Sequence, residues 1–272
     1  MRMGKLVGAE LFKIRKRRMS FALLGVLICF FLLIFFLHYR AVGGSSASLE
    51  AAHPLLFPQV FALIFNTASG IGTLLLVILA SFVMGEEYGW GTIGKTMAGV
   101  VVRHRYLGAK VVSLFIVALI ITLISLVLGI ILGFATTAHF SEVSLDFVTL
   151  SLLGKVGRML GGTVLVLMTN ALLALMFVIL TRSAWWGVGG YILYGFLDLA
   201  ITANSLWGGG WISHIPRYLI IPNTSSILQM EEGVSTWLLH STIPHATVVL
   251  LAWCLLFSGM SFYLFRRQDI TV

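Results

Sequence analysis

Residues 89–96 read GWGTIGKT and match the phosphate-binding loop pattern G-x-x-x-x-G-K-[ST] at Gly89, Gly94, Lys95 and Thr96. In that motif the backbone N–H groups of a glycine-rich turn hold the phosphates of a nucleotide, and the lysine and the hydroxyl complete the site. The motif needs a buried strand of about 4–8 residues before it and a helix after it. The flanking residues therefore decide whether the match has this function.

The segment before Gly89 does not read as a strand. From Pro58 to Met84 the chain is a run of roughly 27 mostly apolar residues, which is the length of a membrane-spanning helix. A second long apolar run begins at Lys110, and the residues between the two runs are too few for a nucleotide-binding domain. We therefore predict that the match is accidental and that it belongs to a loop between two spans.

The composition also indicates a membrane protein. Of the 272 residues, 59% are hydrophobic and 10% are charged, whereas soluble domains are typically about 45–50% apolar and about 25% charged. Cys29 and Cys254 each lie in a long apolar run, where cysteine acts as a small apolar side chain, so no disulfide framework is indicated. The predicted fold class is an all-α integral membrane protein, with residues 1–272 as a single transmembrane domain.

Six apolar runs are long enough to cross about 30 Å of hydrocarbon as helices. We place these spans at about 19–38, 58–84, 110–135, 158–181, 184–203 and 245–265. With the N-terminus in the cytoplasm, the cytoplasmic side holds fourteen of the 18 Lys and Arg residues. The positive-inside rule therefore predicts a multi-pass protein of the cytoplasmic membrane with both termini in the cytoplasm.

Shorter helices are predicted outside the spans. Val7, Leu11 and Ile14 share one helical face, and a basic cluster follows them. This pattern is typical of an amphipathic interfacial helix whose basic residues face anionic lipid headgroups. Residues 204–244, between spans five and six, contain apolar pieces too short to span, which we expect to form interfacial or re-entrant helices.

The loop between spans two and three is a candidate docking surface. Glu86 and Glu87 lie where the second span ends, and Arg103, Arg105 and Lys110 lie where the third begins. A short cytoplasmic helix with charges at both ends offers a surface on which a soluble protein can dock. The alternative is that the basic residues only anchor the span ends and that the glutamates form a solvated helix end.

This loop resembles the coupling segment of permease subunits in the type-2 ABC exporter family. That family typically has an acidic pair at the end of the second span, a following Gly-Thr, and then an Arg and a Lys that lead into the third span. The matching positions here are Glu86, Glu87, Gly91, Thr92, Arg103 or Arg105, and Lys110. The N-terminal AELFKIRKRR and the C-terminal YLFRRQDI resemble the corresponding ends of family members. The glycine-rich GWGTIG departs from the family pattern and leaves the limits of the coupling helix open.

The resemblance implies that the chain is one half of a membrane passage. Two permeases, identical or related, would pair in the membrane, and each would bind a separate ABC ATPase that carries ATP and magnesium. The chain itself would have no catalytic residue and no cofactor, and its other partners would be membrane lipids rather than nucleic acid. Glu86 and Glu87 would fix the loop at the membrane exit, and Thr92–Val102 would dock on the ATPase as a coupling helix. Arg103 and Arg105 would pair with ATPase carboxylates or lipid phosphates.

Polar residues inside the spans are further candidates, because such residues are costly in hydrocarbon and often functional. Asn66, Asn170 and Asp198 are predicted either to hydrogen-bond between helices or to line a substrate path. For Asp198, near the outer end of the fifth span, an interfacial carboxylate reached by water is the alternative. The seven histidines show no metal-ligand spacing, so we assign no metal site.

Two other classes of function compete with the permease. A stand-alone secondary transporter or channel would need ion-coupling charges at mid-bilayer. An intramembrane enzyme would need His, Asp and Ser residues that converge at one depth. The sequence offers neither set of residues. The direction of transport, export, follows from the resemblance alone, and no residue identifies the substrate.

Overall fold

The computed structural model describes residues 3–43, 55–93, 102–140, 149–205, 210–228 and 242–268, and the regular elements in these ranges are helices. In chain order they are α1 (Met3–Lys16), α2 (Arg18–Gly43), α4 (Val60–Gly89), α6 (Arg103–Phe140), α7 (Leu150–Thr181), α8 (Ala184–Ser205), the 3-10 helix η2 (Gly210–Tyr218), α9 (Ile220–Ile227) and α10 (Ile243–Arg267). Six of them, α2, α4, α6, α7, α8 and α10, are long and apolar enough to cross a membrane. The predicted all-α membrane fold with six spans is confirmed.

Several helices extend beyond the predicted spans. α6 has 38 residues, so at 1.5 Å per residue it is about 57 Å long and exceeds a hydrocarbon layer of about 30 Å. α4 continues past the predicted limit at Met84 to Gly89. The sequence limits followed the apolar residues, whereas a helix continues wherever its backbone hydrogen bonds can still form. As a result, Glu86 and Glu87 lie in the last turn of α4 rather than in a loop.

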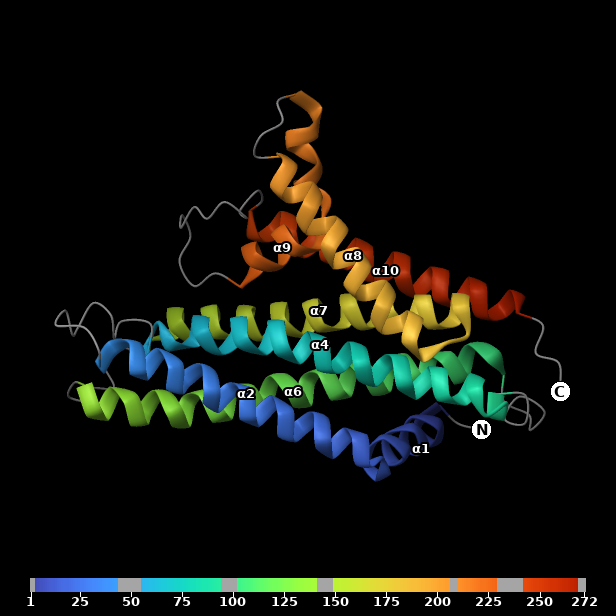
Figure 1. Cartoon of the computed structure of the whole chain (residues 1–272), viewed down its shortest axis with the longest axis horizontal. Helices are drawn as coiled ribbons and strands as arrows, with labels where there is room; N and C mark the ends of the chain where they lie inside the picture. Colours follow the sequence, from blue (N-terminus) through green and yellow to red (C-terminus); the bar gives the residue numbers. More distant parts are fainter. Residues whose placement is uncertain are drawn as a thin grey trace.

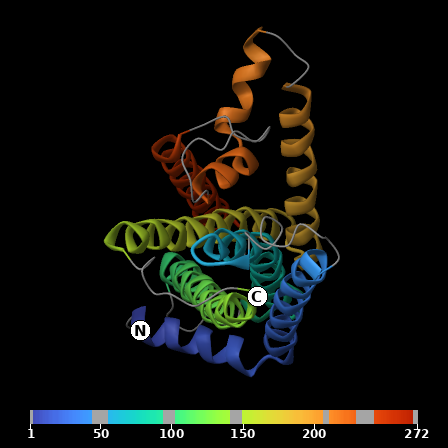
Figure 2. The ribbon, with the colours of Figure 1, turned by 90° about the vertical axis from the view of Figure 1, so that its left-hand side faces the viewer.

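α7 lies between two groups of helices. Figures 1 and 2 show α2, α4 and α6 on one side of it and α8, α9 and α10 on the other. α4 and α7 form the centre, since 72% and 78% of the residues in an apolar 18-residue stretch of each helix are buried, against 17–33% in the other four spans. α2, α8 and α10 therefore keep large apolar surfaces exposed.

α4 and α8 approach closely beside the turn that joins α7 to α8. A Cβ atom on Gly85 would lie 2.5 Å from the Cα atom of Ala184, and one on Gly187 would lie 2.4 Å from Oγ of Ser81. Only glycine permits such backbone contact. The last turns of α4 are thereby fixed against the α7–α8 turn.

The two ends of the bundle have different compositions. At one end, on the right in Figure 1, lie both termini, α1, the last turns of α4 and α10, and the first turns of α6. We call this the charged end, residues 10–17, 86–88, 103–110 and 265–268. The last turns of α8, with η2 and α9, lie away from the charged end, above α7 in Figure 1, and we call them the opposite end of the molecule.

Candidate functional site

The last turn of α4 leads into a turn formed by Gly91. The N–H of Gly91 donates to the carbonyl of Tyr88 at 3.2 Å. Gly91 has a φ of 62°, a left-handed conformation that glycine adopts readily at the end of a helix. The hydroxyl of Thr92 donates to the carbonyl of Glu87 at 3.3 Å. Trp90 and Gly91 therefore form the turn that ends α4, and Thr92, which follows the turn, binds back to its last residues.

Lys110 is the centre of a group of ion pairs, with its side chain 1% exposed. Its Nζ lies 2.9 Å from Oε2 of Glu10 in α1 and 2.8 Å from Oε2 of Glu87 in α4. Glu87 also accepts a hydrogen bond from the hydroxyl of Tyr106, whose ring centroid is 5.1 Å from the Lys110 Nζ. Because an isolated charge is costly to bury, these carboxylates are what allow Lys110 to be charged inside the protein.

Two further cations come from Lys13 of α1 and from Arg17, which lies between α1 and α2. Nζ of Lys13 lies 2.8 Å from Glu10 and 3.1 Å from Glu87, and Nη1 of Arg17 lies 2.7 Å from Oε2 of Glu86. Three carboxylates thus face three cations, and their formal charges cancel. We use the name ion-pair cluster for Glu10, Lys13, Arg17, Glu86, Glu87 and Lys110. The cluster joins α1 to both α4 and α6.

The pKa values of Glu10 and Lys13, the two members of the cluster in α1, are shifted in the directions that favour their charged forms. Burial alone would raise the pKa of Glu10, but the charge of Lys110 and hydrogen bonds from Lys13 and Lys110 lower it below its ordinary value. Burial alone would lower the pKa of Lys13, but its hydrogen bond to Glu10 and the charge of Glu87 raise it above its ordinary value. Both side chains are therefore ionised at neutral pH.

The end of α10 is hydrogen-bonded to α4, α6 and α7 at the charged end. The hydroxyl of Tyr88 donates to Oε1 of Gln268 at 2.6 Å, and Nε2 of Gln268 donates to the carbonyl of Ile179 in α7. Nη1 of Arg103 donates to the carbonyls of Arg266 at 3.0 Å and Gln268 at 3.1 Å. These contacts hold α4, α6 and α7 together beside the loop.

The structure gives the predicted loop residues different environments. Glu86, Glu87 and Lys110 come together in the ion-pair cluster, whereas Arg103 binds the end of α10 and Arg105 is exposed. Gly91 lies in the turn after α4, and Thr92 directly follows this turn.

Residues 94–101, most of the predicted coupling helix Thr92–Val102, lie outside the described residues, so its docking stays a prediction. Gly94, Lys95 and Thr96 of the phosphate-loop pattern fall in the same range. Gly89, however, is the last residue of the 30-residue helix α4, and a phosphate-binding loop follows a strand.

Glu10 was predicted from the sequence only as part of an N-terminal motif, and its pairing with Lys13 and Lys110 in the ion-pair cluster was not predicted. A signal was present, because Glu10 is the only carboxylate in residues 1–49. It also lies three residues after Val7 and four before Ile14, on the apolar face of the helix. A carboxylate on the face that becomes buried needs a partner.

The polar residues inside the spans have local partners. Nδ2 of Asn66 donates to the carbonyl of Ala62, and Nδ2 of Asn170 donates to that of Val166, both at 2.8 Å. These bonds lie within single helices, whereas bonds between helices were one of the predictions. Asn170 also borders a cavity of about 190 Å³ between α4, α7, α8 and α9.

Asp198 is buried, with 1% of its surface exposed, and is not the water-exposed interfacial carboxylate that was the alternative. Its Oδ2 accepts the N–H groups of Ile220 at 2.9 Å and Ile221 at 3.0 Å. These are the first two N–H groups of α9, which have no partner within their own helix. Asp198 therefore fastens α9 to α8. Within the described ranges, no group of three or more His, Cys, Asp and Glu side chains could hold a metal ion.

A family model described as an ABC-2 family transporter protein matches residues 6–198. This chain belongs to the ABC-2 transporter family. The matched range covers well over half of the chain and includes every residue of the ion-pair cluster. A comparison with curated proteins gives no match. As an ABC-2 family member with six spanning helices, the chain is a multi-pass membrane protein and a permease subunit of an ABC transporter.

Proposed function

We propose that this ABC-2 permease works as a dimer and that a separate ABC ATPase drives it through the loop of residues 94–101. The observation that carries the proposal is the ion-pair cluster. Glu87 stands just before the loop, Lys110 stands just after it, and both are bound to each other and to α1. A force applied to the loop therefore reaches α1, α4 and α6 together.

In this proposal the charged end faces the cytoplasm, and the membrane is the cytoplasmic membrane. Its support is the distribution of basic residues, fourteen of 18 on that side, which the positive-inside rule associates with the cytoplasm. α1, with its basic residues Lys13, Arg15 and Lys16 near its end, then lies at the inner headgroup layer. η2 and α9 lie at the outer side.

Closure of two ATPases on ATP would move the loops inward and tilt the helices attached to them. Breaking a buried ion pair by losing one partner costs about 3–5 kcal/mol. Because the ion pairs are costly to break, we expect the inward movement of the loop to tilt α1, α4 and α6 together, with the side chains of the cluster keeping their partners. Such a rigid unit is the kind of two-state element whose equilibrium an ATPase can bias.

The substrate path and the second permease would lie against the less buried helices. In α2, α8 and α10, 17%, 22% and 28% of the residues in an apolar 18-residue stretch are buried, so their apolar surfaces are available to a second copy or to lipid. The cavity beside Asn170 would provide hydrogen-bonding groups along the path. ATP and magnesium would bind the partner ATPase and not this chain.

The experiment is a pull-down of the tagged chain from detergent-solubilised native membranes, followed by an ATPase assay. We expect a separate ATPase to co-purify with the unaltered chain. Arg105→Ala, at an exposed position beside the loop, should weaken this capture. Glu87→Gln should keep the ATPase but reduce the stimulation of ATP hydrolysis by substrate or lipid. Arg40→Ala, an exposed arginine at the other end of α2, is the control and should change neither result.

Two outcomes would contradict the proposal. If the purified chain alone hydrolyses ATP, the pattern at Gly89–Thr96 is a nucleotide site after all. If the chain neither captures an ATPase nor binds a nucleotide, a transporter or channel that acts alone becomes the better interpretation.

A further inference from the structure

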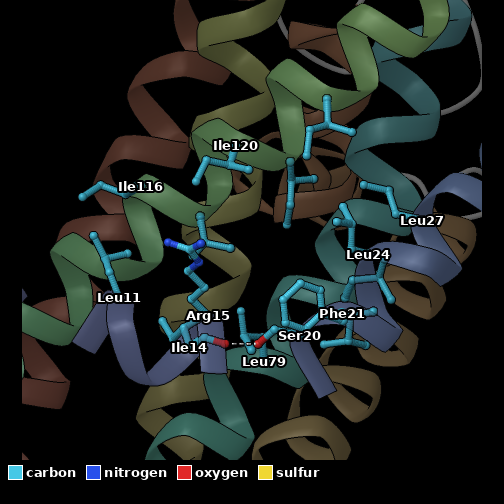
Figure 3. A pocket seen from close by; sticks show the side chains of 15 residues that line it. Leu11, Ile14, Arg15, Ser20, Phe21, Leu24, Leu27, Leu79, Ile116 and Ile120 are labelled. Carbon is cyan, nitrogen blue, oxygen red and sulfur yellow. Dashed lines mark hydrogen bonds between the residues drawn. The ribbon is translucent and has the colours of Figure 1, made fainter. Parts of the chain in front are cut away.

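A groove of about 390 Å³ runs between α1, α2, α4 and α6, beside the ion-pair cluster (Figure 3). Its walls are almost entirely leucine, isoleucine, valine and phenylalanine side chains from these four helices. Two polar residues also line it, Ser20 and Arg15. The hydroxyl of Ser20 is satisfied, because it donates to the carbonyl of Ile14 at 2.6 Å. Arg15 is the one charged side chain among the lining residues.

Arg15 extends from α1 into this groove, and Figure 3 shows its guanidinium directed toward Ile116 and Ile120 of α6. Two nearby cations have ion-pair partners, Lys13 of α1 with Glu87 at 3.1 Å and Arg17, which follows α1, with Glu86 at 2.7 Å. Within the described part of the chain, no ion pair includes Arg15. Arg15 is an exposed residue, so an anion that enters the mouth of the groove can reach its guanidinium and form a charge-assisted hydrogen bond.

The groove opens sideways, toward the surroundings of the spans. Phe21 and Ile120 on its walls are 62% and 47% exposed, although both belong to spanning helices. These surfaces face hydrocarbon in a membrane, whereas α1 lies at the end of the spans, where headgroups lie. The groove thus combines a cation at headgroup depth with an apolar wall at acyl-chain depth.

The length of the groove along the spans favours a lipid over a second copy of the chain as its occupant. Its wall on α6 runs from Ile116 to Ile124, which is about 12 Å at 1.5 Å per residue. One leaflet contributes about 15 Å of hydrocarbon. The groove therefore matches the acyl chain of one leaflet, whereas a spanning helix of a neighbouring copy would pack along the full width of the membrane.

We propose that this groove binds one anionic diacyl phospholipid, with an acyl chain between α2 and α6 and the headgroup phosphate on Arg15. The lipid lies beside Leu11 and Ile14 of α1, so it helps to hold α1 against α6, next to the ion-pair cluster. This site is distinct from the loop that docks the ATPase, and lipid binding does not depend on that docking.

The test is native mass spectrometry of the full chain, purified in detergent and incubated with equimolar phosphatidylglycerol and phosphatidylcholine. We expect the unaltered chain to retain phosphatidylglycerol preferentially. Arg15→Gln should reduce this preference about tenfold, which corresponds to about 1.4 kcal/mol, because the variant loses a charge-assisted hydrogen bond to the phosphate. Arg15→Lys should restore part of it.

Lys16→Gln is the matched control. It removes a cation one position away, whose Nζ lies over the ring of Phe12 at 5.7 Å and which does not line the groove. The preference of this variant should equal that of the unaltered chain. Ile120→Trp fills the groove and should reduce retention of both lipids, and Leu24→Phe on the opposite wall repeats the test if that variant does not fold.

Three results would overturn the proposal. Arg15→Gln could keep the preference or lose no more of it than Lys16→Gln. Glycerol phosphate, which has no acyl chain, could displace phosphatidylglycerol, and the site would then be one for small anions. Ile120→Trp could change the dimer population without changing lipid retention, and the groove would then belong to a neighbouring copy of the chain.

Discussion

The two ends of the bundle are held together by different interactions. At the charged end, three carboxylates and three cations from α1, α4, α6 and the junction of α1 and α2 form the ion-pair cluster. At the opposite end, most of the bonds go to backbone carbonyls. Asn223 donates to the carbonyl of Arg217 at 2.9 Å, and Nε1 of Trp253 donates to that of Tyr218 at 2.8 Å. Asp198 is the carboxylate that holds α9.

This difference indicates which end resists deformation. Losing Lys110, whose side chain is 1% exposed, leaves the buried carboxylates of Glu10 and Glu87 without the cation that both bind, which costs about 3–5 kcal/mol. Losing one neutral hydrogen bond at the opposite end costs about 0.5–1.5 kcal/mol. We therefore expect the charged end to move as one body and the opposite end to rearrange when the passage opens.

The largest effect is expected for Lys110→Met. The variant leaves Glu10 and Glu87 close together without the buried cation that both bind, and it should destabilise the chain by about 3–5 kcal/mol. Thermal unfolding of the purified chain in detergent measures the loss. Lys155→Met, an exposed lysine of α7, is the control and should have little effect. Equal losses for the two variants would show that the cluster does not stabilise the charged end.

Glu10→Gln should have a somewhat smaller effect, and it depends on pH. The carboxylate receives charge-assisted hydrogen bonds from Lys13 and Lys110, so its loss should cost about 2–3 kcal/mol at neutral pH. The pKa of Glu10 is lower in the folded chain than its ordinary value of 4.5. Its contribution is therefore complete above that value and declines as the pH falls through the folded pKa.

The measurement is the unfolding temperature of the unaltered chain and of Glu10→Gln as the pH is lowered. The difference between them should be constant near neutrality and shrink only below a pH of about 4.5. A difference that shrinks first on the alkaline side, or not at all, would contradict the ionic origin of the stability.

A smaller loss is expected at the opposite end for Asp198→Ala. The variant removes the acceptor of two N–H groups at the start of α9, which corresponds to the loss of a helix cap and costs about 1–2 kcal/mol. Asn204→Ala is the control. Asn204 is an exposed residue of α8, the helix that carries Asp198, and its described hydrogen bond goes to the carbonyl of Ala200 in that helix. A loss as large as that of Lys110→Met would remove the contrast between the two ends.

The smallest effect concerns the backbone at the charged end. Gly91→Ala places a Cβ on a residue with φ of 62°, although no atom lies close enough to clash, so the expected cost is about 1 kcal/mol. Gly89→Ala, in the last turn of α4 with equally open surroundings, should be neutral or stabilising because alanine favours helices. Equal unfolding temperatures for the two variants would show that the left-handed turn is not needed.

The spans could be predicted from the sequence because hydrocarbon requires long apolar helices, and all six were found. The partners of the charged residues could not be predicted in the same way. Glu10 pairs with a lysine 100 positions later in the chain, and that distance is closed only by the packing of α1 on α6. Arg103 and Asp198 bind backbone groups. Because every residue carries such groups, these two pairings leave no mark in the sequence.

Only Arg182 and Ser183 separate α7 from α8. With so short a connection, the two spans leave the ribosome in immediate succession, and we expect them to enter the bilayer together as a hairpin. Arg182 is the single Lys or Arg between Arg158 and Arg217, and it stands at the hairpin tip, where the positive-inside rule acts most directly. We therefore expect Arg182 to orient this hairpin during synthesis, before the basic pair Arg266 and Arg267 is made and without help from the basic cluster at the N-terminus.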